Sequence, residues 1–109
     1  MQDIKEKLIK KYIMKIKKDV SEGSFVFVER QKNIQFLKDN GLLVQDAIDI
    51  ILDICIRDYH KGPEKDKDEY EGQIWVFKYD FEGIIIYIKF NINPPNKTTC
   101  ISFHEDENC

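Results

Sequence analysis

Residues 73–90 read QIWVFKYDFEGIIIYIKF, two runs of alternating character that flank the dipeptide Glu82-Gly83. Alternation with a period of two predicts β-strands, and a glycine that tolerates positive φ predicts a two-residue hairpin turn between them. Counting outward from the turn pairs Phe81 with Ile84, Tyr79 with Ile86, Lys78 with Tyr87, Phe77 with Ile88, Val76 with Lys89, and Trp75 with Phe90. This hairpin decides the fold, because it sets which side chains share each face of a sheet.

The pairing separates the hairpin into one apolar face and one mixed face. The apolar face must meet the helices, and it carries Trp75, Phe77, Tyr79, Phe81, Ile84, Ile86, Ile88 and Phe90. The mixed face carries Val76, Lys78, Asp80, Ile85, Tyr87 and Lys89. A strand over residues 98–104 is expected to add Ile101 and Phe103 to the apolar face, and Cys100, Ser102 and His104 to the mixed face. We therefore expect an open sheet surface that groups Lys, Tyr, Ser and His side chains.

Helical periodicity dominates the sequence before this region. Residues 2–19 predict a basic amphipathic helix, residues 25–28 a short strand, residues 30–39 a short helix that ends at Asn40-Gly41, and residues 43–57 a second long helix. Residues 64–72 predict a polar loop, residues 73–79, 84–92 and 98–104 predict strands, and residues 105–109 predict a frayed tail. The order α-β-α-α-β-β-β predicts a single α+β domain over residues 1–109, with the helices packed on one face of a small antiparallel sheet.

The charge balance limits the classes of function. The 109 residues hold 17 Lys and Arg against 20 Asp and Glu, a net charge of −3, which argues against a general polyanion-binding protein. Residues 1–19 are the exception, because they carry seven Lys against three acidic residues. An RNA-binding site elsewhere must be built from a few placed cations.

Several other classes are not expected. No stretch approaches the roughly 20 apolar residues of a membrane span, and no apolar segment follows the N-terminal charges, so we expect a cytoplasmic chain without membrane contact. The three cysteines, Cys55, Cys100 and Cys109, are widely spaced, which favours free thiols. Together with the two histidines they do not match a zinc site, and we expect no metal and no cofactor.

Short motifs in the second half of the chain resemble one family of proteins. They are Asp58-Tyr59-His60-Lys61-Gly62-Pro63, Ile74-Trp75, Ile86-Tyr87-Ile88-Lys89 and Cys100-Ile101-Ser102-Phe103-His104. In this order they resemble the MqsR family of toxins, and the resemblance runs from Phe25 to Glu105. Members are ribonucleases of type II toxin–antitoxin systems with a RelE-like α+β fold. They cleave single-stranded mRNA without a metal, by 2′-hydroxyl attack on the adjacent phosphate, and a cognate antitoxin silences them. The resemblance therefore implies an mRNA endoribonuclease with an antitoxin partner.

The resemblance also implies candidate catalytic residues. The lysine of the D-Y-x-K stretch is Lys61, and the strand tyrosine is Tyr87. A family lysine near the end of the last strand is replaced here by His104, and a strand glutamine just after the tryptophan is replaced by Val76. His104 is a chemically reasonable substitute, because histidine can act as acid or base near neutrality. Val76 cannot replace an amide.

The implied chemistry needs a base at the 2′-hydroxyl, an acid at the leaving 5′-oxygen, and cations near the phosphorane. We expect His104 and Tyr87 to exchange the protons, and Lys61 and Lys89 to stabilise the charge. The residues expected to contact substrate are Lys78, which takes the space of the missing amide, Arg30, Lys32, Ser102, and His60 as a second candidate acid or base. The alternative for Tyr87 is a half-buried strand aromatic, and for the other residues it is an ordinary solvated polar side chain.

Two other functions compete with the ribonuclease. The first is a non-catalytic protein-interaction module on the same fold, such as a degenerate toxin or a phage-borne regulator, which the acidic balance and Val76 favour. The second is a DNA-binding repressor. It has little support, because the helix over residues 43–57 shows no cluster of Arg, Asn or Gln on its open face. We therefore expect no DNA binding by the chain on its own.

Overall fold

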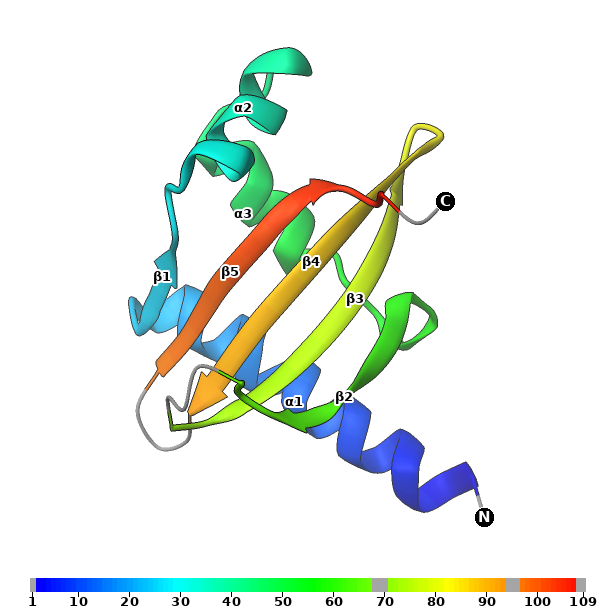
Figure 1. Ribbon diagram of the computed structural model, residues 1–109. Coiled ribbons are helices and arrows are strands. Elements are labelled where there is room, and N and C mark those ends of the chain that lie inside the picture. The colour runs from blue at the N-terminus through cyan, green and yellow to red at the C-terminus, as the bar shows by residue number, and fades with distance from the viewer. Residues whose placement is uncertain (1, 68–70, 94–96, 108–109) are drawn as a thin grey trace.

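Within residues 2–67, 71–93 and 97–107, which the computed structural model describes, the chain forms three α-helices, one 3-10 turn and five strands (Figure 1). In chain order they are α1 (Gln2–Glu22), β1 (Phe25–Phe27), α2 (Gln31–Asp39), α3 (Val44–Leu52), η1 (Ile56–Asp58), β2 (Tyr59–Lys65), β3 (Gln73–Phe81), β4 (Ile84–Asn93) and β5 (Lys97–Glu105). The strands form one sheet in the order β1-β5-β4-β3-β2, with β1 parallel to β5 and the other neighbours antiparallel. The predicted α+β class is confirmed, and β1 and β2 extend the predicted three-stranded meander at its two edges.

The β3–β4 hairpin has the predicted register. The turn residues Glu82 and Gly83 have positive φ angles of 52° and 93°, the conformation in which a two-residue turn follows the twist of its strands. Asp80 supports the turn, since its Oδ1 accepts a hydrogen bond of 2.8 Å from the Gly83 backbone N–H. The six predicted pairs all occur.

The helices cover the apolar face of the sheet, as predicted (Figure 1). Trp75, Phe77 and Phe90 have no exposed surface. They share one core with helical side chains, namely Ile9, Ile13 and Ile16 of α1, Phe36 and Leu37 of α2, and Ala47, Ile50 and Ile51 of α3. Tyr12 of α1 stacks on Trp75 with a ring-centroid distance of 4.7 Å. Because the helices lie on one side, the mixed face remains available for a site.

The second long helix is shorter than predicted, because α3 ends at Leu52 instead of residue 57. The backbone N–H groups of Asp53 and Ile54 bond to carbonyls three residues earlier, which tightens the last turn. The next N–H, that of Cys55, donates to Asp58 Oδ2 at 2.9 Å and so leaves the helical pattern. The Asp58 carboxylate thereby competes with continuation of the helix, and η1 follows.

A strand occupies residues that the sequence pattern did not mark as one. β2 pairs with β3, so the predicted loop is wrong for Glu64 and Lys65; residues 68–70 of that loop lie outside the described residues. β2 is an edge strand with mostly exposed side chains and two register shifts, and such an edge has no alternation to detect. Gly62, with φ at 130°, brings it against β3, where an added Cβ would lie 2.7 Å from the Ile74 carbonyl oxygen.

β5 places Phe103, Ser102 and His104 on the predicted faces of the sheet, but a register shift beyond Ser102 makes Ile101 an extra residue. Cys100 then pairs with Phe90 and lies in the core with no exposed surface, so its predicted place on the mixed face is wrong. Burial raises the pKa of the Cys100 thiol well above its usual range. Ile101, which we expected in the core, is only half-buried.

The Asn33 side chain on α2 binds the chain at this bulge. Asn33 has no exposed surface, and its Nδ2 donates to the carbonyl oxygens of Val28 and Ile101 at 2.9 Å each. Its Oδ1 accepts a hydrogen bond of 2.9 Å from the Phe103 backbone N–H. One amide therefore ties α2 to β5 at the point where the bulge interrupts the ladder.

Both ends of the chain are more regular than predicted. α1 continues to Glu22 instead of residue 19, and the buried Asp19 accepts a hydrogen bond of 2.7 Å from Thr98 Oγ1 on β5. Glu105 still belongs to β5, and the Asp106 N–H donates to the Ile85 carbonyl oxygen at 2.8 Å. The expected fraying is therefore wrong for Glu105 and Asp106, and residues 108–109 lie outside the described residues.

Candidate functional site

A hollow of about 280 Å³ lies on the mixed face of the sheet, beside the start of α2. The residues that line it are Arg30, Tyr87, Lys89, Ser102, His104, Asp106 and Glu107. The first five are predicted site residues, and they come from the N-cap of α2, from β4 and from β5. The β4–β5 register brings them together, because it pairs Tyr87 with His104 and Lys89 with Ser102.

This face is more enclosed than the open surface that we expected. Val76 has no exposed surface, and Ser102 and His104 are only 3% and 8% exposed. The segment after β2 also contacts β4, where Asp66 Oδ2 accepts a hydrogen bond of 2.7 Å from Asn91 Nδ2. Enclosure matters for chemistry, because charges interact more strongly where water is excluded.

Tyr87 and His104, which both line the hollow, form a stacked pair. Their ring centroids lie 5.6 Å apart with an interplanar angle of 18°. Nδ1 of His104 lies 3.0 Å from the Glu105 carbonyl oxygen. A carbonyl oxygen only accepts hydrogen bonds, so Nδ1 is the donor in this contact and Nε2 is the second ring nitrogen.

Cationic groups flank this pair. Arg30 Nη2 donates to Ser102 Oγ at 2.7 Å, which holds the guanidinium across β5. Lys89 pairs with Ser102 from the neighbouring strand. Arg30 and Lys89 therefore approach the hollow from its two sides. The hydrogen bond from Arg30 to Ser102 fixes the position of the guanidinium.

Two carboxylates in the site were missed because the segment after β5 was taken for a frayed tail. Asp106 is 5% exposed, and its Oδ2 lies 2.9 Å from Lys78 Nζ. Glu107 Oε1 lies 2.9 Å from Lys32 Nζ. Hydrogen bonding from Lys32, together with its charge, lowers the pKa of Glu107 below its usual value. Lys78 and Lys32, both predicted to contact substrate, thus each have an acidic partner.

Lys61 and His60 are not among the residues that line this hollow. Both lie on β2, where Lys61 pairs with Val76, which in turn pairs with Lys89. Two strand spacings of about 4.8 Å separate the Lys61 backbone from that of Lys89. The Lys61 ammonium is half-exposed, 3.8 Å from Glu64 Oε1. The structure therefore brings Tyr87, His104, Lys89, Arg30 and Ser102 together and leaves Lys61 and His60 at the β2 edge.

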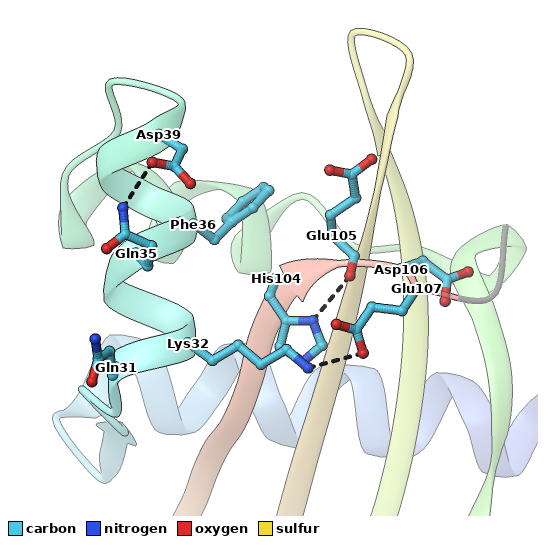
Figure 2. Close-up of a pocket in the computed structure, with 9 residues that line it drawn as sticks. All are labelled: Gln31, Lys32, Gln35, Phe36, Asp39, His104, Glu105, Asp106 and Glu107. Atoms are coloured by element: carbon cyan, nitrogen blue, oxygen red, sulfur yellow. Dashed lines mark hydrogen bonds and ion pairs between the residues drawn. The ribbon is translucent and has the colours of Figure 1, made fainter.

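A second hollow, of about 660 Å³, adjoins the first on the α2 side. Figure 2 shows its lining, with Gln31, Lys32, Gln35, Phe36 and Asp39 on α2 facing His104, Glu105, Asp106 and Glu107. His104, Asp106 and Glu107 line both hollows. His104 thus lies where the hollow along α2 meets the hollow on the mixed face of the sheet. An extended ligand could occupy both hollows and contact His104 from either one.

The donor set of the site suits proton transfer and anion binding. Among the described residues, no group of three or more His, Cys, Asp or Glu side chains gathers in a geometry that could hold a metal ion. Among the helices that the structure describes, none is long and apolar enough to cross a membrane. An imidazole, a phenol and two cations are groups that can serve acid–base chemistry at a phosphate.

Comparison with known proteins identifies one family. The sequence model described as motility quorum-sensing regulator, toxin of MqsA, matches residues 10–105. No curated protein and no solved structure gives a significant match. The matched range includes every residue that lines the first hollow except Asp106 and Glu107.

Proposed function

The chain belongs to the MqsR family of toxins, which makes it the toxin of a toxin–antitoxin system, and from that premise we propose that it is a metal-independent endoribonuclease that cleaves mRNA. Its partners are then a cognate antitoxin and single-stranded mRNA, and its place of action is the cytoplasm. The observation that carries the proposal is the stacked pair of Tyr87 and His104, which lines one hollow together with the cations Arg30 and Lys89. His104 is only 8% exposed, whereas an ordinary solvated strand face leaves its polar side chains in water.

His104 and Tyr87 are assigned the two proton transfers. Nε2 of His104 takes the proton from the 2′-hydroxyl, whose oxygen then bonds to the adjacent phosphorus. The bond from phosphorus to the 5′-oxygen breaks, and the Tyr87 hydroxyl gives its proton to that oxygen. The products are a 2′,3′-cyclic phosphate and a 5′-hydroxyl, and proton exchange with solvent restores both groups.

The cations stabilise the additional negative charge on the phosphorane. Arg30 and Lys89 border the hollow directly, and a guanidinium suits bidentate contact with phosphate oxygens. Lys61, placed at the β2 edge, is assigned to the phosphate of a neighbouring nucleotide, with His60 beside it. Lys78 and Lys32 complete the binding surface, and their carboxylate partners hold them in position.

A non-catalytic interaction module remains a second candidate, and one observation favours it. Asp106 and Glu107 line the hollow, and they pair with Lys78 and Lys32, two lysines predicted to contact substrate. This arrangement leaves fewer free cations for RNA than the sequence suggested. The two functions differ in whether the antitoxin-free chain cuts RNA.

Expression of the chain alone is expected to stop bacterial growth, and co-expression of its antitoxin to restore growth. The reason is that unrestrained cleavage depletes mRNA. Colony counts and culture density after induction measure both effects. A vector that carries the chain with His104→Asn is the control, because it should permit growth. Normal growth in the presence of abundant soluble wild-type chain would contradict the toxin function.

RNA cleavage is expected to continue in excess EDTA and to leave 2′,3′-cyclic phosphate ends. In the proposed mechanism protein side chains supply the acid, the base and the cations, so a chelator removes nothing that the reaction needs. Mass spectrometry of the fragments from a defined single-stranded RNA identifies the ends. Activity that disappears in EDTA and returns with Mg²⁺ would contradict this mechanism while leaving RNA cleavage itself in place.

A further inference from the structure

The outward side of α1 carries a regular stripe of exposed residues, which we name the α1 stripe: Ile4, Lys7, Lys11, Met14 and Lys18. Their spacing alternates between three and four residues, so they follow one line along the helix for about 21 Å. The buried residues Ile9, Ile13 and Ile16 occupy the opposite side. α1 therefore has one face in the core and a second, separate face toward solvent.

The composition of the α1 stripe indicates a binding surface. Ile4 and Met14 are 77% and 70% exposed, so two apolar side chains lie in water on the same line as the three lysines. Among the residues that the structure describes, no carboxylate lies within ion-pair distance of Lys7, Lys11 or Lys18. These three lysines therefore give the α1 stripe a local positive charge on a chain whose net charge is −3.

The first turns of α1 extend the surface. They project beyond β2, the edge of the sheet (Figure 1). Ile4 borders an apolar hollow of about 460 Å³ there, together with Leu8, Pro63 and Trp75. The stripe thus ends at a hollow that can take a large apolar side chain of a partner.

These features favour a protein partner over RNA. A spacing that alternates between three and four residues is the one with which one helix packs along another. Sequence-tolerant RNA binding uses aromatic stacking platforms, and the α1 stripe contains aliphatic and lysine side chains only. The stripe also faces away from the sheet, whereas the candidate catalytic hollow lies on the sheet face that the helices do not cover.

We propose that the α1 stripe is the docking surface for an acidic amphipathic helix of the antitoxin, an inference that rests on the proposed toxin function. Apolar side chains of that helix cover Ile4 and Met14, and its carboxylates pair with Lys7, Lys11 and Lys18. The charge complementarity speeds association and makes it sensitive to salt. RNA cleavage by the free chain does not use this surface.

The test measures the affinity of the full chain for the purified antitoxin, defined as the protein that restores growth. The fluorescence of Trp75, the single tryptophan, provides the signal because it lines the adjoining hollow. The double variant Lys7→Glu with Lys11→Glu and the single variant Ile4→Asp are each expected to raise Kd at least tenfold. Lys38→Glu on α2 and Leu43→Asp, at a residue 72% exposed, are the matched controls and should stay within twofold of wild type.

The outcomes separate the inference from the function on which it rests. Loss of affinity in the stripe variants, with controls bound and RNA cleavage unchanged, supports the docking surface. Wild-type affinity in both stripe variants overturns it. Reduced RNA cleavage by Lys7→Glu with Lys11→Glu at unchanged Kd also overturns it, and assigns the surface to RNA. A wild-type chain that no antitoxin binds or restrains overturns the toxin function and this inference together.

Discussion

Tyr87→Phe and His104→Asn are each expected to lower the rate of RNA cleavage by about a hundredfold or more, with the fold intact. Tyr87→Phe removes the proton donor and keeps the ring that stacks on His104. Asparagine suits position 104, because its amide N–H can replace Nδ1 as donor to the Glu105 carbonyl. Unlike imidazole, the amide nitrogen cannot accept a proton as a general base. Initial rates on a defined single-stranded RNA measure the effect.

Two measurements separate a chemical role from a structural one. The pH dependence of cleavage is expected to contain a limb that His104→Asn abolishes. Tyr79→Phe is the matched control, since it removes the same hydroxyl from the neighbouring strand on the helix-covered face, where the phenol donates to Asp53 Oδ2 at 2.6 Å. It should cleave RNA like wild type. Full activity of both Tyr87→Phe and His104→Asn would mean that this hollow is not the catalytic site and would direct attention to Lys61 and His60.

Asn33→Ala is expected to lower the free energy of unfolding by about 3 kcal/mol or more, one of the largest losses available from a single polar residue in this chain. The substitution leaves the Val28 and Ile101 carbonyls and the Phe103 N–H without the partners that the buried amide provides. Each unsatisfied buried group costs about 1–3 kcal/mol. Urea unfolding followed by circular dichroism gives the value.

A control on the same helix isolates the role of the amide. Gln35→Ala removes an exposed side-chain hydrogen bond to Asp39, at 2.8 Å, and should change stability by no more than about 0.5 kcal/mol. Asn33→Asp should destabilise at least as much as Asn33→Ala, because a carboxylate would face two carbonyl oxygens. A loss below about 1 kcal/mol for Asn33→Ala would show that water or backbone shifts replace these bonds.

Local signals account for the central part of the fold. The hairpin pairs were predictable because Glu82-Gly83 accepts two positive φ angles and the alternation on each side admits only one register. The same register predicts that Tyr87 faces away from the core and shares its face with Lys78 and Lys89. Those three placements depend on nearest neighbours in sequence and a single turn, so they required no information from distant parts of the chain.

Other features depended on partners far away in the sequence. The bulge in β5 forms hydrogen bonds with the Asn33 side chain, which precedes Phe103 by 70 residues in the sequence. The end of α3 depends on the Asp58 carboxylate. β2 has no alternating pattern of its own, and its pairing with β3 defines it. A local sequence pattern cannot reveal such contacts, because the two residues that make each contact lie in different parts of the chain.

By itself the sequence determined the α+β class, the β3–β4 register, the family resemblance and the placement of Tyr87, Lys89, Ser102 and His104 on one face. Tertiary structure alone decided how enclosed that face is, which cations carry acidic partners, and how far Lys61 lies from the Tyr87–His104 pair. The physical reason is that strand pairing and helical periodicity arise from neighbours within a few residues. Burial and ion pairing arise wherever the fold brings distant segments together, as it does for Lys78 and Asp106.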